Sequence, residues 1–78
     1  MSTVLRADGY QVVVYTRDHL PPHVHVFLGG GEEEVVVCLD PVAIREIRGM
    51  RLQHVVAAVR VVEDHAGLLM MKWREVHG

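Results

Sequence analysis

Three turn signals divide the first half of the chain into four short segments rich in β-branched residues. The signals are an Asp-Gly pair at 8–9, a Pro-Pro pair at 21–22 and a Gly-Gly-Gly run at 29–31. Asp-Gly is typical of a hairpin turn, because glycine tolerates a positive φ angle, and proline cannot donate a hydrogen bond inside a sheet. The glycine run lacks the helix and the Lys-Ser/Thr pair of a phosphate loop, so it also indicates a hairpin. The segments between these signals predict strands over residues 3–6, 11–16, 23–28 and 33–39.

The second half of the chain has the pattern of helices. Asp40-Pro41 is typical of a helix start and Gly49 of a helix end, which predicts a short helix over 41–48. Apolar residues then recur every three or four positions over 51–76, which predicts a long helix. We therefore expect a single α+β domain over residues 1–78. Its antiparallel sheet of three to four strands would be followed by a short helix and a long C-terminal helix packed on one sheet face.

The length of the expected C-terminal helix bears on assembly. A helix over 51–76 would be about 39 Å long, whereas a compact domain of this size is about 30 Å across. The helix should therefore overhang the sheet, bend at Gly67 or pack on another chain. A second, weaker apolar stripe on this helix favours a homo-oligomer formed through it.

Composition excludes several classes of protein. A single cysteine, Cys38, excludes an internal disulfide and a thiolate zinc cluster within one chain, and it suits a reducing cytoplasm. Charge at Arg6 comes too early for a signal peptide, and no apolar run approaches the roughly 18–20 residues of a membrane span. The net charge of −2 argues against broad nucleic-acid binding but leaves room for a small basic site. We expect a cytoplasmic protein without membrane contact.

The segment Asp18-His19-Leu20-Pro21-Pro22-His23-Val24-His25-Val26 contains three of the six histidines. Alternate residues of a strand share one face and lie about 6.5 Å apart. His23 and His25 should therefore share a face, with Val24 and Val26 on the other. If the long helix covers the valines, the two imidazoles point away from the core and are free for solvent, a ligand or a partner.

One chemical interpretation of this face is acid–base catalysis without metal or other cofactor. Two imidazoles can take a proton from a ribose 2′-hydroxyl and return one to a leaving oxygen, while an arginine stabilises the phosphate charge. The candidate catalytic residues are then His23, His25 and His19. Arginine suits phosphate contacts, and the candidate nucleic-acid-binding residues are Arg6, Arg17, Arg45 and Arg48.

Two other interpretations remain open from the sequence. His23 and His25 could bind a metal ion with a third ligand from His19, Asp18 or a glutamate among residues 32–34. They could also be inert polar residues on the solvent face of a hairpin. Asp18 suits the role of a turn cap through an Asx hydrogen bond better than that of a catalyst.

Several parts of the sequence together resemble the short bacterial domain-of-unknown-function family 4160. These parts are Thr3-Val4-Leu5-Arg6, Asp8-Gly9-Tyr10, Tyr15, the Asp-His-x-Pro-Pro-His-Val-His segment, Leu39-Asp40-Pro41 and Trp73. The family has no settled activity. Its members are often encoded beside another small protein, an arrangement similar to toxin–antitoxin pairs. The resemblance therefore implies a component of such a pair whose histidine face binds or cleaves RNA, with a small protein partner encoded nearby. The alternative is a non-catalytic module that binds protein or nucleic acid as a homo-oligomer.

Overall fold

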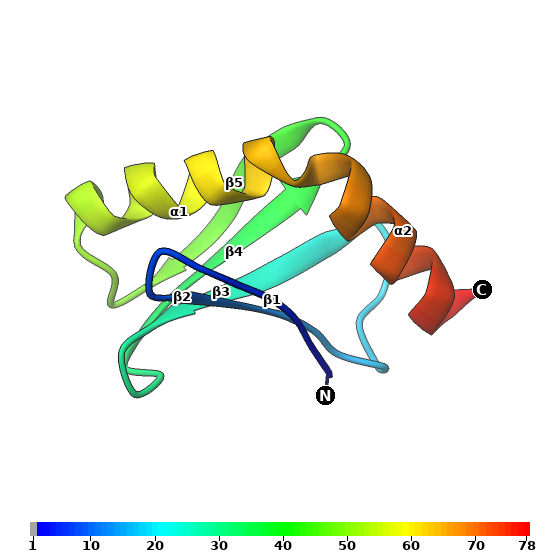
Figure 1. The fold of residues 1–78 in the computed structure, drawn as a ribbon, viewed down its shortest axis with the longest axis horizontal. Coiled ribbons are helices and arrows are strands. Elements are labelled where there is room, and N and C mark those ends of the chain that lie inside the picture. The colour runs from blue at the N-terminus through cyan, green and yellow to red at the C-terminus, as the bar shows by residue number, and fades with distance from the viewer. Residues whose placement is uncertain (1) are drawn as a thin grey trace.

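The computed structural model describes residues 2–78 as a five-stranded antiparallel sheet followed by two helices (Figure 1). The sheet is a simple meander in which each strand pairs with the next along the chain. This arrangement confirms the α+β class and the antiparallel sheet, which has one strand more than the upper expectation. The elements are β1 (Ser2–Ala7), β2 (Tyr10–Val14), β3 (His23–Leu28), β4 (Glu33–Leu39), β5 (Val42–Arg48), α1 (Leu52–Asp64) and α2 (Ala66–His77).

The turn signals of the first half act as the sequence predicts. Asp8 and Gly9 both have positive φ angles, 53° and 83°, as the tight turn between β1 and β2 requires. The glycine run joins β3 to β4, and Leu28 pairs with Glu33 across that hairpin. The bounds expected for β3 and β4 are confirmed, whereas β2 ends earlier than expected.

Val42–Arg48 form strand β5, so the short helix expected over 41–48 is wrong. Asp40 and Pro41 form a two-residue connection, and Leu39 pairs directly with Val42. An Asp-Pro pair suits a turn as well as a helix start, and pairing with the valine-rich β4 favours the extended form. Ile44 lies opposite Val37 and Glu46 opposite Val36, so the register shifts at Arg45, which is an extra residue in a β-bulge.

The expected long helix is divided into α1 and α2 at His65, whose φ and ψ are −124° and 17°. The His65 ring Nδ1 donates to the carbonyl oxygen of Val61 at 2.8 Å, which satisfies one of the free carbonyls at the end of α1. The break lies two residues before Gly67, where the bend was expected. With the break, the chain fits within 33 × 22 × 20 Å. No single helix of residues 2–78 therefore has the length on which the expected overhang rested, and the homo-oligomer stays a prediction.

The helices cover one face of the sheet and enclose the apolar core there (Figure 1). The strands contribute mainly valines, and Val12, Val24, Val26, Val35 and Val37 have no exposed surface. Ala58 and Val62 of α1 and Leu69 of α2 complete this core with the same lack of exposure. The opposite face of β3 carries the histidines. No helix among residues 2–78 is long and apolar enough to cross a bilayer.

Candidate metal centre

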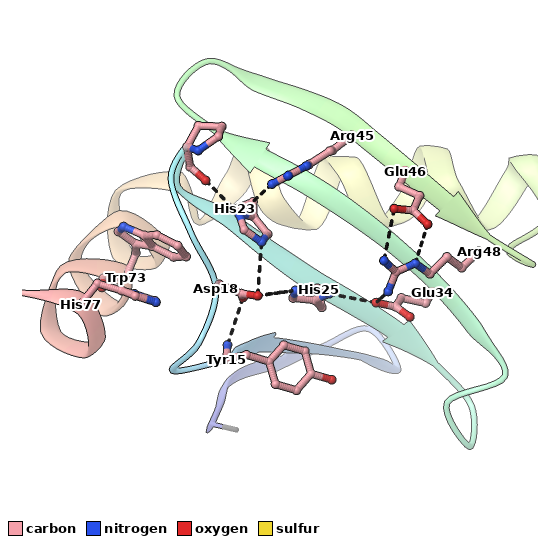
Figure 2. A network of polar contacts seen from close by, with 11 residues as sticks. Tyr15, Asp18, His23, His25, Glu34, Arg45, Glu46, Arg48, Trp73 and His77 are labelled. Atoms are coloured by element: carbon pink, nitrogen blue, oxygen red, sulfur yellow. Dashed lines mark hydrogen bonds and ion pairs between the residues drawn. The ribbon is translucent and has the colours of Figure 1, made fainter.

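β3 places His23 and His25 on one face and Val24 and Val26 on the other, as the period of two predicts. The expectation that the two imidazoles are free for solvent is wrong, because His23 is 5% exposed and His25 7% exposed. The loop after β2, the bulged strand β5 and Trp73 of α2 cover them (Figure 2). The histidines therefore form a second buried cluster, which is polar, on the side of the sheet away from the apolar core.

Asp18 lies between the two imidazoles. Its backbone N–H donates to the Tyr15 carbonyl, and its Oδ2 accepts the Tyr15 N–H, each at 3.2 Å, so it closes the turn over 15–18. The expected turn role is confirmed, but the bond goes back to Tyr15 and is not the expected Asx bond to a later residue. The same carboxylate approaches His25 Nε2 at 3.1 Å and His23 Nε2 at 3.5 Å. Asp18 therefore serves the turn and the histidine cluster together.

Each imidazole has a separate acceptor for its other ring nitrogen. His23 Nδ1 lies 2.8 Å from the carbonyl oxygen of Pro21, and His25 Nδ1 lies 2.9 Å from Glu34 Oε2 (Figure 2). Hydrogen bonds to these two oxygens require a proton on each Nδ1 atom. In the neutral rings, both Nε2 lone pairs then face the Asp18 carboxylate. Three electron-rich atoms then lie within 4.8 Å of one another, and a cation or additional protons between them would offset their repulsion.

Two arginines of β5 border the cluster. The bulge at Arg45 brings its Nη1 within 3.2 Å of His23 Nδ1. Arg48 donates to Glu34 Oε2 at 3.2 Å and to Glu46 Oε2 at 2.7 Å. The hydrogen bond from Arg48 lowers the pKa of Glu46 below its usual value. Glu34 therefore joins Arg48 to His25, and Arg48 is neutralised by two carboxylates.

Aromatic rings enclose the cluster on both sides. The Tyr15 ring meets His25 edge-on at 4.6 Å, and Trp73 lies 5.4 Å from His23 and stacks on His77 at 3.7 Å. Burial, followed by the negative charges of Glu34 and Asp18, raises the pKa of Tyr15. Its phenol therefore stays neutral at physiological pH. Trp73 is also part of the apolar core, as expected.

An open cavity of about 240 Å³ gives access to the cluster. Its lining includes His23, His25, Asp18 and four of the residues expected to contact substrate, His19, Arg17, Arg45 and Arg48. His19 and Arg17 are exposed and stand at the rim. Arg6 is not at this site, because it lines a separate hollow at the β1–β2 turn.

Two residues of the site were not found from the sequence. Glu34 was considered only as one of three glutamates that could supply a ligand, and Tyr15 only as part of a family pattern. The signal for Glu34 was the hairpin register, since Phe27 lies opposite Glu34 and therefore places Glu34 diagonally next to His25. Counting back from the glycine turn would have identified it.

Comparison with known families places the chain among domains of unknown function. Residues 9–74 match the family described as Domain of unknown function (DUF4160), so the chain belongs to that family, as the resemblance implied. No curated protein and no solved structure matches the chain.

Proposed function

We propose that Asp18, His23 and His25 bind one divalent metal ion of the zinc class, and that the ion activates a water molecule for hydrolysis. The observation that carries the proposal is the convergence of both Nε2 atoms on one carboxylate while each Nδ1 has its own acceptor. Two imidazoles and one carboxylate form a common ligand set for catalytic zinc, and they leave a fourth position for water.

The spacing of the donor atoms supports the proposal. Zinc bonds of about 2.0–2.1 Å in tetrahedral geometry separate neighbouring ligand atoms by roughly 3.4 Å. Asp18 Oδ1 lies 3.3 Å from His25 Nε2 and 3.5 Å from His23 Nε2, on either side of this value. All three donor atoms lie within 4.8 Å of one another, so binding would draw the two imidazoles together by at most about 1.4 Å.

The residues behind the ligands also suit a metal ion. A metal-bound histidine usually donates its second ring N–H to a carboxylate or a backbone carbonyl, which fixes the ring orientation and raises its basicity. Glu34 has this position behind His25, and the Pro21 carbonyl has it behind His23. This arrangement holds both rings with Nε2 toward the ion site.

The metal-free cleavage of RNA, with this chain as part of a toxin–antitoxin-like pair, is the second candidate. One observation favours it: Arg45 Nη1 is near enough to donate to His23 Nδ1, which would move the ring proton to Nε2. The Asp18 carboxylate argues against it, because its charge lies between the imidazoles, where the substrate phosphate would have to bind. The shorter distance from His23 Nδ1 to the Pro21 carbonyl also favours the metal-binding tautomer.

Calorimetric titration of zinc into chelator-treated protein tests the proposal. We expect one tight site per chain in the wild type and loss of that site in Asp18→Asn, which retains an oxygen to cap the turn but lacks the charge. His19→Ala is the matched control, because His19 is a neighbouring histidine outside the ligand set. The visible spectrum of the cobalt-substituted protein reports the coordination number independently.

Two results would contradict the proposal. One is the absence of stoichiometric zinc binding by the wild type. The other is equal binding by Asp18→Asn and the wild type, which would place the zinc elsewhere. Cleavage of RNA by the wild type in the presence of a chelator, abolished in His23→Ala, would establish the metal-free candidate instead.

A further inference from the structure

We infer that the cavity beside Asp18, His23 and His25 binds the phosphoryl group of a phosphate ester. This inference rests on the proposed metal site and names its substrate class. Three properties of the cavity carry the inference: two guanidinium groups without carboxylate partners, a charge that becomes positive with a bound ion, and a second hollow next to it.

Arg17 and Arg45 are the guanidinium groups available to an anion. Both line the cavity, and within residues 2–78 neither has a carboxylate at ion-pair distance. Arg48 lines the same cavity, but Glu46 and Glu34 already neutralise it. Arginine presents its donors in a planar fork that fits two phosphate oxygens at once. The cavity therefore has two phosphate-binding groups that no carboxylate neutralises, although Arg45 also contacts His23 Nδ1.

The charge around the cavity indicates the kind of anion. Arg17, Arg45 and Arg48 balance the carboxylates of Asp18, Glu34 and Glu46 when the histidines are neutral. A bound divalent ion would leave an excess of two positive charges. A phosphate monoester dianion cancels this excess, and a phosphodiester cancels half of it. In phosphoryl transfer, negative charge develops on the oxygens of the phosphoryl group, and a metal ion and arginines stabilise that charge.

The shape of the site separates the phosphoryl group from the rest of the ester. The cavity of about 240 Å³ is smaller than the roughly 300 Å³ at which ordinary ligand pockets begin. A second hollow of about 380 Å³ shares Asp18 and His19 with it and is also lined by Leu20 and Arg74. Leu20 is 76% exposed, an apolar contact for an organic group. The phosphoryl group would bind at the ion and the ester group over Leu20.

The reaction that follows is hydrolysis with water as the only co-reactant. The oxygen of the ion-bound water forms a bond to phosphorus, and the ester phosphorus–oxygen bond breaks. The electron pair of that bond goes to the leaving oxygen, which takes a proton equivalent to the one lost by the water. The products are an alcohol and a phosphate with one fewer ester bond.

Binding of inorganic phosphate to the zinc-loaded full chain tests the inference. We expect Arg17→Gln and Arg45→Gln each to weaken phosphate binding about tenfold or more, because each removes a charge-assisted contact. Zinc affinity should stay within about twofold in Arg17→Gln, which contacts none of the proposed ligands. Arg6→Gln is the matched control, because Arg6 lines a different hollow. The zinc-loaded wild type should also hydrolyse p-nitrophenyl phosphate, a monoester, or bis(p-nitrophenyl) phosphate, a diester. Comparing the two rates shows which kind of ester is the substrate.

The possible results distinguish the phosphate inference from the proposed zinc site on which it rests. Failure of the wild type to bind zinc would remove the metal site and the phosphate inference together. Normal zinc binding with phosphate affinity equal in Arg17→Gln, Arg45→Gln and Arg6→Gln would overturn the phosphate inference alone. Hydrolysis of p-nitrophenyl acetate but neither phosphate ester by the zinc-loaded protein would also overturn it.

Discussion

At the scale of single residues, Glu34 has the largest expected effect among groups that would not touch the ion. Its carboxylate accepts from His25 Nδ1 and from Arg48, and its side chain is only 14% exposed. Both bonds go to Oε2, and in Glu34→Gln the neutral amide oxygen at that position is a weaker acceptor for the imidazole N–H and for Arg48. We expect zinc affinity to fall about 10–100-fold, as measured by calorimetric titration.

Glu46→Gln is the control for that measurement. Glu46 shares Arg48 with Glu34 but makes no hydrogen bond to either histidine. Zinc affinity in Glu46→Gln should therefore match the wild type. An equal fall in the two variants would mean that the affinity depends on Arg48, and that Glu34 does not act through His25.

The residues of the site differ in how far the sequence could predict them. The shared face of His23 and His25 followed from the strand period alone, and a turn role for Asp18 followed from its residue type, although its bond goes back to Tyr15. Burial of the imidazoles could not be predicted, because it depends on Asp18, Arg45 and Trp73, which reach the cluster from three other elements. Arg45 reaches His23 from a bulge in a strand, and the pattern around it favoured a helix.

At the scale of elements, Glu33 of β4 fixes the start of α1. Glu33 Oε1 accepts the backbone N–H of Arg51 at 3.0 Å and approaches His54 Nδ1 at 2.8 Å. The hydrogen bond from the His54 side chain, followed by that from the Arg51 backbone, lowers the pKa of Glu33. Arg51 makes no side-chain cap of its own, so this carboxylate supplies an acceptor at the helix start.

The lowered pKa predicts how stability depends on pH. A carboxyl whose folded-state pKa lies below its unfolded value of about 4.3 stabilises the fold above that value. The contribution is lost as the pH falls through the folded-state pKa. We expect Glu33→Gln to have a lower Tm than the wild type at neutral pH, and the difference to shrink below about pH 4. Thermal unfolding followed by circular dichroism at several pH values measures this difference in Tm.

Glu32→Gln is the control, because Glu32 lies at an exposed turn position, and its Tm should match that of the wild type. If the Tm difference of Glu33→Gln persists undiminished at acid pH, the ionised Glu33 carboxylate is not the stabilising group.

Leu69 and Trp73 are the buried residues of α2, and Leu69 is the more completely buried of the two. Leu69 has no exposed surface, whereas its neighbour Leu68 is 37% exposed. Leu69→Ala should lower the free energy of unfolding by about 2–5 kcal/mol, because it removes a buried side chain and leaves a cavity. Leu68→Ala makes the same chemical change at the surface and should cost much less. Urea unfolding measures both, and similar losses would mean that α2 is not held through Leu69.

The elements also show where sequence patterns are ambiguous. Strand β3 was predictable because turn residues mark both of its ends, and the glycine run also marks the start of β4; these marks indicate a turn and nothing else. Asp40-Pro41 has two, a helix start and a tight turn, and only pairing with β4 decides between them. At the break, the His65 side chain makes a hydrogen bond to the Val61 carbonyl. The spacing of apolar residues carries no information about such a bond.

At the scale of the whole molecule, the sheet separates an apolar core from a polar cluster. The apolar core lies under the helices, and the polar cluster buries two imidazoles with the carboxylates of Asp18 and Glu34. Burying such groups costs free energy unless they are paired, and a chain of this size has little stability to spare. The proposed ion would compensate that cost by pairing with the lone pairs that converge on Asp18. Metal binding and folding should therefore be coupled.

This coupling predicts a large thermal shift. A ligand that binds only the folded state at 100 times its Kd stabilises it by about 2.7 kcal/mol, which corresponds to about 10–20 °C in Tm for a domain of this size. We expect zinc to raise the Tm of the wild type by this amount and a chelator to reverse the rise. Asp18→Asn should gain little, while His19→Ala should behave as the wild type. An equal rise in Asp18→Asn would show that zinc acts through other histidines, such as His54 or His77, and that the cluster of β3 pairs internally without an ion.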